Sequence, residues 1–321
     1  MVPKFKPPLL LRSATVQTIL ASLKFEKLKQ NAMFEQAKLH LIQAGKNVRL
    51  IGYLSKQMNK NPKGLVLLLH GWEGHINSAY ILKTGAYLYN NGFDIFRINL
   101  RDHGGTHHLN EGIFNGSLFE ETMAAAKEVS KLADKGNPFF VIGFSLGGNF
   151  ALRIARNNTK KIIPNLKHAV GISPAIHPKS STEMMDENPF LRKYFLKQWM
   201  RSLEEKERLF PFLYDFEKYK NADTVMKLTE RIIPDYSPYK SADEYFETYT
   251  LTKDYFKNLK TPTTIITAKD DPVVHPEDFY ELTPNPNLTV RIENYGGHNG
   301  FFNSFKLDCY YLPILLEIFS K

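Results

Sequence analysis

The sequence predicts an α/β fold with a mostly parallel central sheet, and three observations support this. Leu65–Leu69 is an unbroken run of five apolar residues, which is typical of a strand covered on both faces. Further apolar runs alternate with helical patterns along the chain. The segment Gly143–Gly147, of the form G-x-S-x-G, joins an apolar run to a helical stretch. Ligands of such sheets bind at the carboxyl ends of the strands.

The remaining elements follow from the same patterns. Helices are expected over residues 78–90, 119–135, 149–157 and 305–319, on both sides of the sheet. An antiparallel edge strand is expected over 48–53, and parallel strands over 65–69, 93–98, 139–142, 168–172, 263–268 and 288–293. About 90 residues separate the strands ending at 172 and starting at 263, where a simple crossover needs roughly 30. The excess, residues 178–249, is rich in Met and aromatic residues and is interpreted as a helical cap above the active face.

Composition predicts one globular domain over 1–321, with the cap at 178–249 and a basic N-terminal lead-in at 1–45. Residues 1–60 hold eleven Lys and Arg against Glu26 and Glu35, which accounts for the whole net charge of +9. This segment is expected to be an ordinary soluble surface, or to make a weak peripheral contact with an anionic membrane. No recognition motif accompanies the basic residues, so nucleic-acid binding is not expected. The single Cys309 suits a cytoplasmic location and a packing role.

Ser145, at the centre of the G-x-S-x-G segment, is the candidate nucleophile. A sharp turn between strand and helix exposes the serine hydroxyl, and flanking glycines prevent Cβ collisions within the bend. The helix that follows presents free backbone N–H groups toward it. Taken alone, the motif is also compatible with a glycine-rich turn that binds phosphate or nothing.

An acid and a base for Ser145 are expected at the ends of the last two strands. Asp270 and Asp271 follow the strand at 263–268, and His298 follows the strand at 288–293 in a glycine-rich loop. A serine hydroxyl needs a base, and the base needs a carboxylate to orient it. Asp271 is favoured over Asp270 as that carboxylate, and Asp270 is expected to cap or brace the loop.

The first strand ends in a loop, His70–Gly74, that is expected to complete an oxyanion hole. The N–H groups of Trp72 and Leu146 are the predicted donors. His70 is expected to make a structural hydrogen bond under this loop. The segment 101–108 contains three histidines, but its two glycines predict a loop and no further ligand set is evident, so no metal site is predicted. Phosphate-binding glycine patterns are absent, so no nucleotide cofactor is predicted either.

With these residues placed, the chain resembles the YheT-like branch of the α/β-hydrolase superfamily, which includes carboxylesterases and lipases. The resemblance runs nearly end to end. It lies in Phe5–Pro8 with Thr15–Ile19, His70–Gly74, Asn99–Arg101, His103–Gly105, Gly143–Asn149, Asp270–Pro272 and Gly296–His298. One departure is Asp102, where relatives often carry glycine. The resemblance implies a Ser145–Asp271–His298 triad and cleavage of short- to medium-chain carboxylic esters without a cofactor.

Two alternatives to ester hydrolysis stay open at this point. The acyl-enzyme could be resolved by an alcohol, which would make the protein an acyltransferase, and this depends on how well the cap excludes water. The fold could also serve as a non-catalytic ligand-binding or membrane-associated module.

Overall fold

The computed structural model describes residues 5–23, 26–58, 61–160 and 162–320, and it confirms the predicted fold class. Eight strands form one sheet in the order β1-β2-β4-β3-β5-β6-β7-β8. The strands from β3 to β8 are parallel, while β2 is antiparallel to both β1 and β4. Their bounds are β1 Ala37–Gln43, β2 Arg49–Ser55, β3 Leu65–Leu69, β4 Asp94–Ile98, β5 Phe139–Phe144, β6 Leu166–Ile172, β7 Thr263–Ala268 and β8 Leu288–Glu293.

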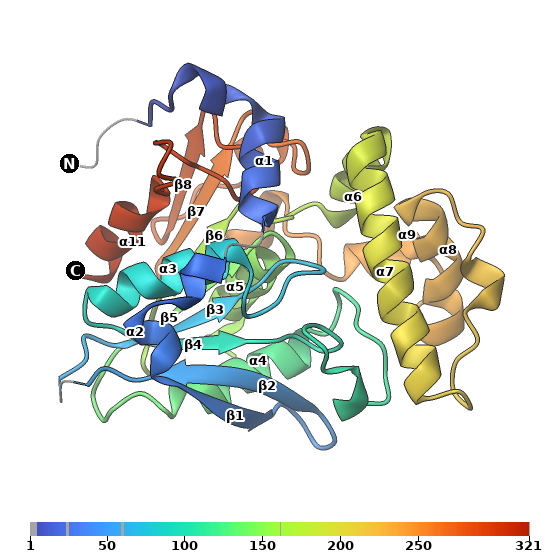
Figure 1. Cartoon of the computed structure of the whole chain (residues 1–321), viewed down its shortest axis with the longest axis horizontal. Helices are drawn as coiled ribbons and strands as arrows, with labels where there is room; N and C mark the ends of the chain where they lie inside the picture. The colour runs from blue at the N-terminus through green and yellow to red at the C-terminus, as the bar shows by residue number, and fades with distance from the viewer. Residues whose placement is uncertain (1–4, 24–25, 59–60, 161, 321) are drawn as a thin grey trace.

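Helices cover the sheet on both faces because the central strands are apolar on both faces (Figure 1). Leu65, Leu67 and Leu69 of β3 share one core cluster with residues of α4 (Phe119–Ser130) and α5 (Leu146–Asn157). Val66 and Leu68 alternate with them and share the second cluster with α3 (Ala79–Asn90) and α11 (Tyr311–Phe319). The sheet is thereby fixed, and the carboxyl ends of its parallel strands meet at one edge.

The structure differs from the predicted elements chiefly at the N-terminal edge. The strand at 48–53 is not the edge, because β1 pairs outside it from Ala37 to Gln43. β1 carries Leu39 and Leu41 on one face, alternating with Lys38 and His40, but this apolar face is exposed in the structure. Helix α5 begins at Leu146, earlier than predicted, whereas α4 ends at Ser130 and α11 begins only at Tyr311.

The segment between β6 and β7, predicted as the cap, forms helices that lie to one side of the sheet (Figure 1). They are α6 Pro178–Glu187, α7 Pro189–Leu209, α8 Val225–Tyr236 and α9 Ala242–Glu247, with the short η4 Glu217–Tyr219. Asn188 caps the start of α7 by accepting from the N–H groups of Phe190 and Leu191. The segment has a core of its own, built on residues such as Phe216, Leu228 and Ile232.

The lead-in also folds against the body. Within it lie η1 (Leu9–Arg12), α1 (Ala14–Ser22), η2 (Glu26–Lys29) and α2 (Ala32–Glu35), before β1. Residues 1–4 and 24–25 of the predicted lead-in are outside the described residues. The short elements η3 (His107–Leu109), η5 (Lys253–Phe256) and α10 (Glu277–Tyr280) complete the described chain. Over the described ranges, no helix combines the length and apolar character that a bilayer crossing requires.

Candidate active site

Ser145 lies in a strained turn between β5 and α5, and the neighbouring positions have no space for a side chain larger than that of glycine. Its backbone has φ 53° and ψ −120°, a left-handed conformation that non-glycine residues rarely adopt. A Cβ on Gly143 would collide with the carbonyl group of Gly147, and a Cβ on Gly147 would collide with the carbonyl oxygens of Leu69 and His70. Strain of this kind persists only where the surroundings over-determine it.

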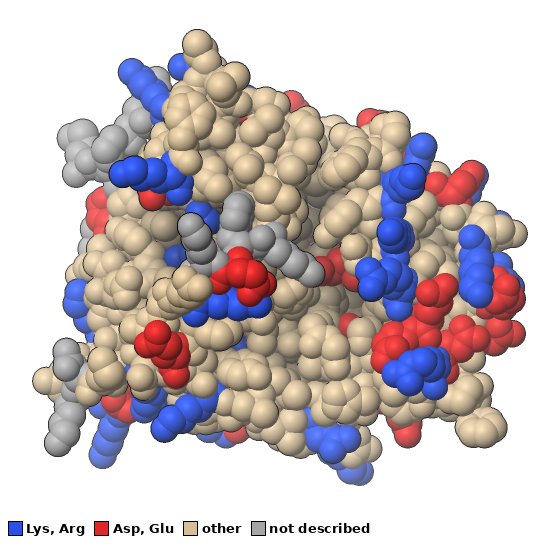
Figure 2. All heavy atoms as spheres, viewed as in Figure 1, with Lys and Arg blue, Asp and Glu red and all other residues tan. Residues whose placement is uncertain are grey.

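Ser145 opens into a cavity of about 290 Å³ between the sheet and the cap. Figure 2 shows a hollow between these two parts, bordered mainly by uncharged atoms, whereas charged side chains gather on the outer surface of the cap. The wall nearest the sheet includes Leu146, His298 and Asn299. The cap contributes mostly apolar and aromatic side chains, among them Met185, Phe195, Trp199, Ile232, Ile233, Tyr245 and Phe246. The cavity therefore combines the polar groups of Ser145 and His298 with a cap wall that is mostly apolar and aromatic.

His298 lies on the same cavity wall and is paired with Asp271. Its Nδ1 is 3.0 Å from both carboxylate oxygens of Asp271, and both side chains are almost fully buried. The carboxylate is itself fixed, since Oδ1 accepts hydrogen bonds from the N–H groups of Val273 and Val274. This arrangement leaves Nε2 as the ring nitrogen free to exchange a proton at the cavity.

Asp270 occupies a different place from Asp271. Its Oδ1 accepts a hydrogen bond from the Gly297 N–H at 3.0 Å, one residue before His298. Burial raises the pKa of the Asp270 carboxyl, and its Oδ2 has no hydrogen-bond partner among the described residues. The structure thus brings His298 together with Asp271, while Asp270 contacts the backbone of the loop that carries the histidine.

The loop after β3 reaches the serine from the other side. A Cβ added to Gly71 would lie 3.1 Å from the Ser145 Cβ, so the loop backbone passes directly beside the nucleophile candidate. The next residue is Trp72, whose ring stacks on Phe195 and meets Trp199 edge to face, both from α7. Leu146 is the first residue of α5, so its N–H has no acceptor within the helix. Trp72 and Leu146 both line the cavity.

Two neutral histidines hold this loop to the loop after β4. His103 Nε2 accepts from the Glu73 N–H at 3.1 Å, and His70 Nε2 accepts from the Leu100 N–H at 3.0 Å. Their Nδ1 atoms lie 2.6 and 2.8 Å from the carbonyl oxygens of Arg101 and Gly71. Burial lowers the pKa of His103 to about 4 and that of His70 well below its usual range, so both rings stay uncharged. His70 thus makes the structural hydrogen bond that was expected of it, and His103 plays a similar structural role.

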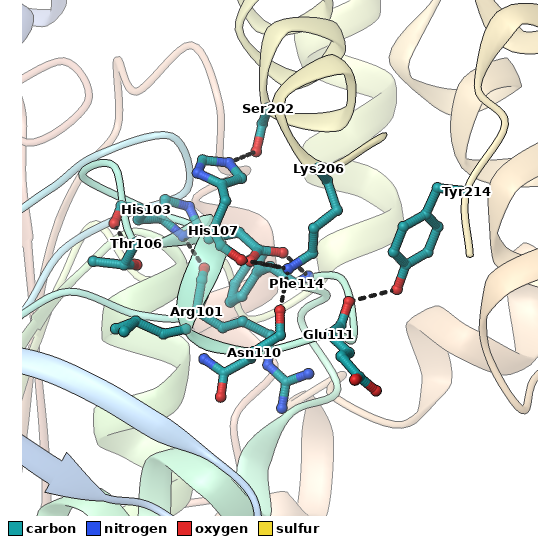
Figure 3. A network of polar contacts seen from close by, with 12 residues as sticks. Arg101, His103, Thr106, His107, Asn110, Glu111, Phe114, Ser202, Lys206 and Tyr214 are labelled. Atoms are coloured by element: carbon teal, nitrogen blue, oxygen red, sulfur yellow. Dashed lines mark hydrogen bonds and ion pairs between the residues drawn. The ribbon is translucent and has the colours of Figure 1, made fainter. Parts of the chain in front are cut away.

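The loop after β4 is joined to the cap by Lys206, which Figure 3 shows among residues of this loop and which forms a buried ion pair with Asp102. Lys206 of α7 lies 2.7 Å from Asp102 Oδ1 and also donates to the carbonyl oxygens of His107 and Asn110. The second carboxylate oxygen of Asp102 accepts from the Phe114 N–H. His107 contacts Ser202, also of α7. Of the histidines of this segment, His107 therefore contacts the cap, whereas His103 holds the two loops together.

The structure brings further residues to the site that the sequence analysis did not assign. Asn299 donates its N–H to Ser173 Oγ, and the His298 N–H donates to Thr18 Oγ1 of α1. Gln17, also of α1, is fully buried against Phe302. The sequence signal at Thr15–Ile19 is limited to a family resemblance. A buried Gln and Thr in a short helix carry no motif that would indicate a contact with a loop so distant in sequence.

Comparisons with known proteins identify the family of the chain. The model of the Hydrolase_4 family, described as serine aminopeptidase, S33, matches residues 60–302. The candidate esterase slr0264 of Synechocystis is 22% identical over 93% of this chain and 87% of its own length. Phospholipase ABHD3 of Bos taurus is 26% identical over 76% of this chain, which spans only 60% of that protein.

Solved structures show the same fold. The Pyrococcus furiosus esterase PF2001 has a TM-score of 0.58 at 18% identity, with 88% of this chain and 90% of that chain covered. A variant of the Saccharomyces cerevisiae monoglyceride lipase has a TM-score of 0.57 at 17% identity, covering 88% of this chain and 94% of its own. The chain is therefore a hydrolase of the α/β-hydrolase fold and belongs to the Hydrolase_4 family.

Proposed function

We propose that the protein cleaves short- to medium-chain carboxylic esters through an acyl-enzyme formed on Ser145. The observation that carries this proposal is the strained serine turn at the floor of a cavity that also holds the buried His298–Asp271 pair. A serine hydroxyl is a weak nucleophile, and an adjacent base with an oriented carboxylate is the arrangement that activates it.

The proposed reaction has two halves. The Ser145 oxygen attacks the ester carbonyl carbon while His298 takes the hydroxyl proton, and Asp271 stabilises the imidazolium. The oxyanion accepts hydrogen bonds from the Trp72 and Leu146 N–H groups. The tetrahedral intermediate then collapses, and His298 returns the proton to the departing alcohol. Water repeats the sequence on the acyl-enzyme, which releases the carboxylic acid and restores the serine.

The cavity supports an acyl ester as the substrate. Its cap wall is apolar and suits a hydrocarbon chain, and its volume of about 290 Å³ lies at the small end of ligand pockets, which run from roughly 300 Å³ upward. Esterase or lipase activity is named for several relatives, including a monoacylglycerol lipase, ABHD2, of Homo sapiens. We also place the chain in the YheT-like branch, on the strength of its lead-in and of Glu73 in the first loop. The expected contact of the lead-in with anionic lipid stays a prediction.

The test is labelling with a fluorophosphonate probe together with hydrolysis of p-nitrophenyl butyrate. Ser145→Ala should abolish labelling and lower turnover on the order of a millionfold. Ser180→Ala, in α6 but outside the cavity lining, should label like the wild type. Equal labelling of wild type and Ser145→Ala would refute the assignment.

A second pair of substrates tests the bond that is cleaved. The ester should be hydrolysed much faster than alanine p-nitroanilide, the matching aminopeptidase substrate. Cleavage of the anilide alone would leave Ser145 as nucleophile but overturn the ester proposal. Added glycerol separates hydrolysis from acyl transfer, because an acyltransferase would divert most of the acyl group to the glyceryl ester.

A further inference from the structure

The histidine loop, residues 295–302 after β8, rests on the N-terminal helix α1. The His298 N–H donates to Thr18 Oγ1 at 2.9 Å. Gln17 brackets Phe302, since its Oε1 accepts from the Phe302 N–H at 2.8 Å and its Nε2 donates to the Phe302 carbonyl at 3.0 Å. In Figure 1, α1 lies beside the chain that follows β8. Two adjacent residues of one helix thus hold the loop at the histidine and four residues beyond it.

The backbone of the histidine loop lies directly against α1, with no room for a side chain between them. Gly297 has φ 52°, and a Cβ there would lie 2.8 Å from Thr18 Oγ1 and 2.5 Å from the Ala14 carbonyl oxygen. A Cβ on Gly300 would lie 2.7 Å from Gln17 Oε1. Since real Cβ atoms do not approach so closely, glycine at these two positions is what lets the loop lie on the helix.

The Thr18 hydroxyl is oriented by a hydrogen bond within α1. It donates its one proton to the Ala14 carbonyl at 2.8 Å, so it presents a lone pair to the His298 N–H. The side chain of His298 is fixed as well, because its ring Nδ1 is paired with Asp271. His298 is therefore held at two points, its backbone nitrogen and one nitrogen of its ring, and these two points determine where Nε2 faces.

We infer that Thr18 and Gln17 are positioning residues, which hold His298 at the distance from Ser145 that proton transfer requires. This inference rests on the proposed function of His298 as the base. Ala21 and Ser22 at the end of α1, and Leu23 directly after it, also line the cavity. The N-terminal segment is thereby a wall of the active site as well as the support of its base.

The experiment compares Thr18→Val with Thr18→Ser. Valine keeps the shape of the side chain and removes the acceptor, whereas serine keeps the acceptor. We expect Thr18→Val to lower kcat and the rate of fluorophosphonate labelling about tenfold with KM unchanged, because small misplacements of a catalytic group cost up to roughly a hundredfold. Thr18→Ser should stay within about twofold of the wild type. Rates are expressed per labelled active site, so that an unfolded fraction does not count as lost activity.

Thr15→Val is the matched control, because it makes the same change on the exposed face of the same helix, and it should leave kcat unchanged. A wild-type kcat in Thr18→Val would overturn the inference. An equal loss in Thr18→Val and Thr18→Ser would also overturn it, since a packing defect would then explain the result. Failure of the proposed function looks different: the wild type itself would not be labelled, or Ser145→Ala would be labelled equally.

Discussion

The serine turn and the histidine loop meet at one cavity, but they are held in place in different ways. Ser145 is fixed by its immediate neighbours, because Gly143 and Gly147 allow β5 and α5 to meet in a bend with no spare space. His298 is fixed by Asp271, 27 residues earlier, and by Thr18, 280 residues earlier. The bend at the nucleophile is thus specified by a local motif, although it also packs on the end of β3 and the loop that follows. The base has no such local motif and depends on contacts between segments far apart in the chain.

Among changes on the histidine side, the largest expected effect comes from replacing one carboxylate oxygen of Asp271. Asp271→Asn should lower kcat about 10⁴-fold with the fold intact, because an amide in place of the carboxylate favours the wrong imidazole tautomer. The matched change Asp270→Asn keeps an acceptor for the Gly297 N–H. We therefore expect kcat to fall less than about tenfold, because the hydrogen bond is retained in neutral form. Steady-state hydrolysis of p-nitrophenyl butyrate measures both. Equal losses in the two variants would contradict the assignment of Asp271 as the partner of the base.

A second contact between distant segments, the ion pair of Lys206 in the cap with Asp102, should contribute to the stability of the fold. Lys206→Met leaves a buried carboxylate without its cation, which should cost about 3–5 kcal/mol of unfolding free energy. Lys227→Met in the same cap breaks an exposed pair with Asp223 and should cost less than about 1 kcal/mol. Urea denaturation followed by circular dichroism gives both values.

Adding Asp102→Asn to Lys206→Met should recover part of the loss, because it neutralises the stranded charge. No recovery would indicate that Lys206 acts through its packing, or through its bonds to the His107 and Asn110 carbonyls.

The same contrast explains what could be predicted from the sequence. β3, β7 and β8 were predicted at their observed bounds, because apolar runs between turn residues are local signals. The G-x-S-x-G turn is equally local. The order of serine, acid and histidine could be read because each follows a strand whose carboxyl end faces the same edge.

What could not be predicted depends on tertiary contacts. β1 was missed although Leu39 and Leu41 alternate with polar residues; both leucines face solvent, so the strand is held by its pairing with β2 and not by a buried apolar face. Thr18 and Gln17 were not assigned a role because their partners lie at the other end of the chain. The pairing of Lys206 with Asp102 was equally hidden, since neither residue belongs to a motif that specifies the other.

The smallest expected effect concerns Glu73, in the loop after β3 that passes beside Ser145. Burial, with Asp102 nearby, raises the pKa of Glu73 from its usual 4.5 to about 7. The folded protein therefore binds this proton more tightly than the unfolded chain, so Glu73 makes stability fall as the pH rises from about 4.5 to about 7. Glu73→Gln should match the wild-type Tm near pH 4, below the usual pKa of the carboxyl, and exceed it near pH 8 by roughly 2 °C, for a gain on the order of 1 kcal/mol after allowance for solvent screening. Thermal melts of both proteins across this range test it, and a Tm difference that does not change with pH would contradict the raised pKa. Because the Glu73 N–H, and not its carboxyl, binds His103, the substitution leaves the loop backbone in place and isolates the charge.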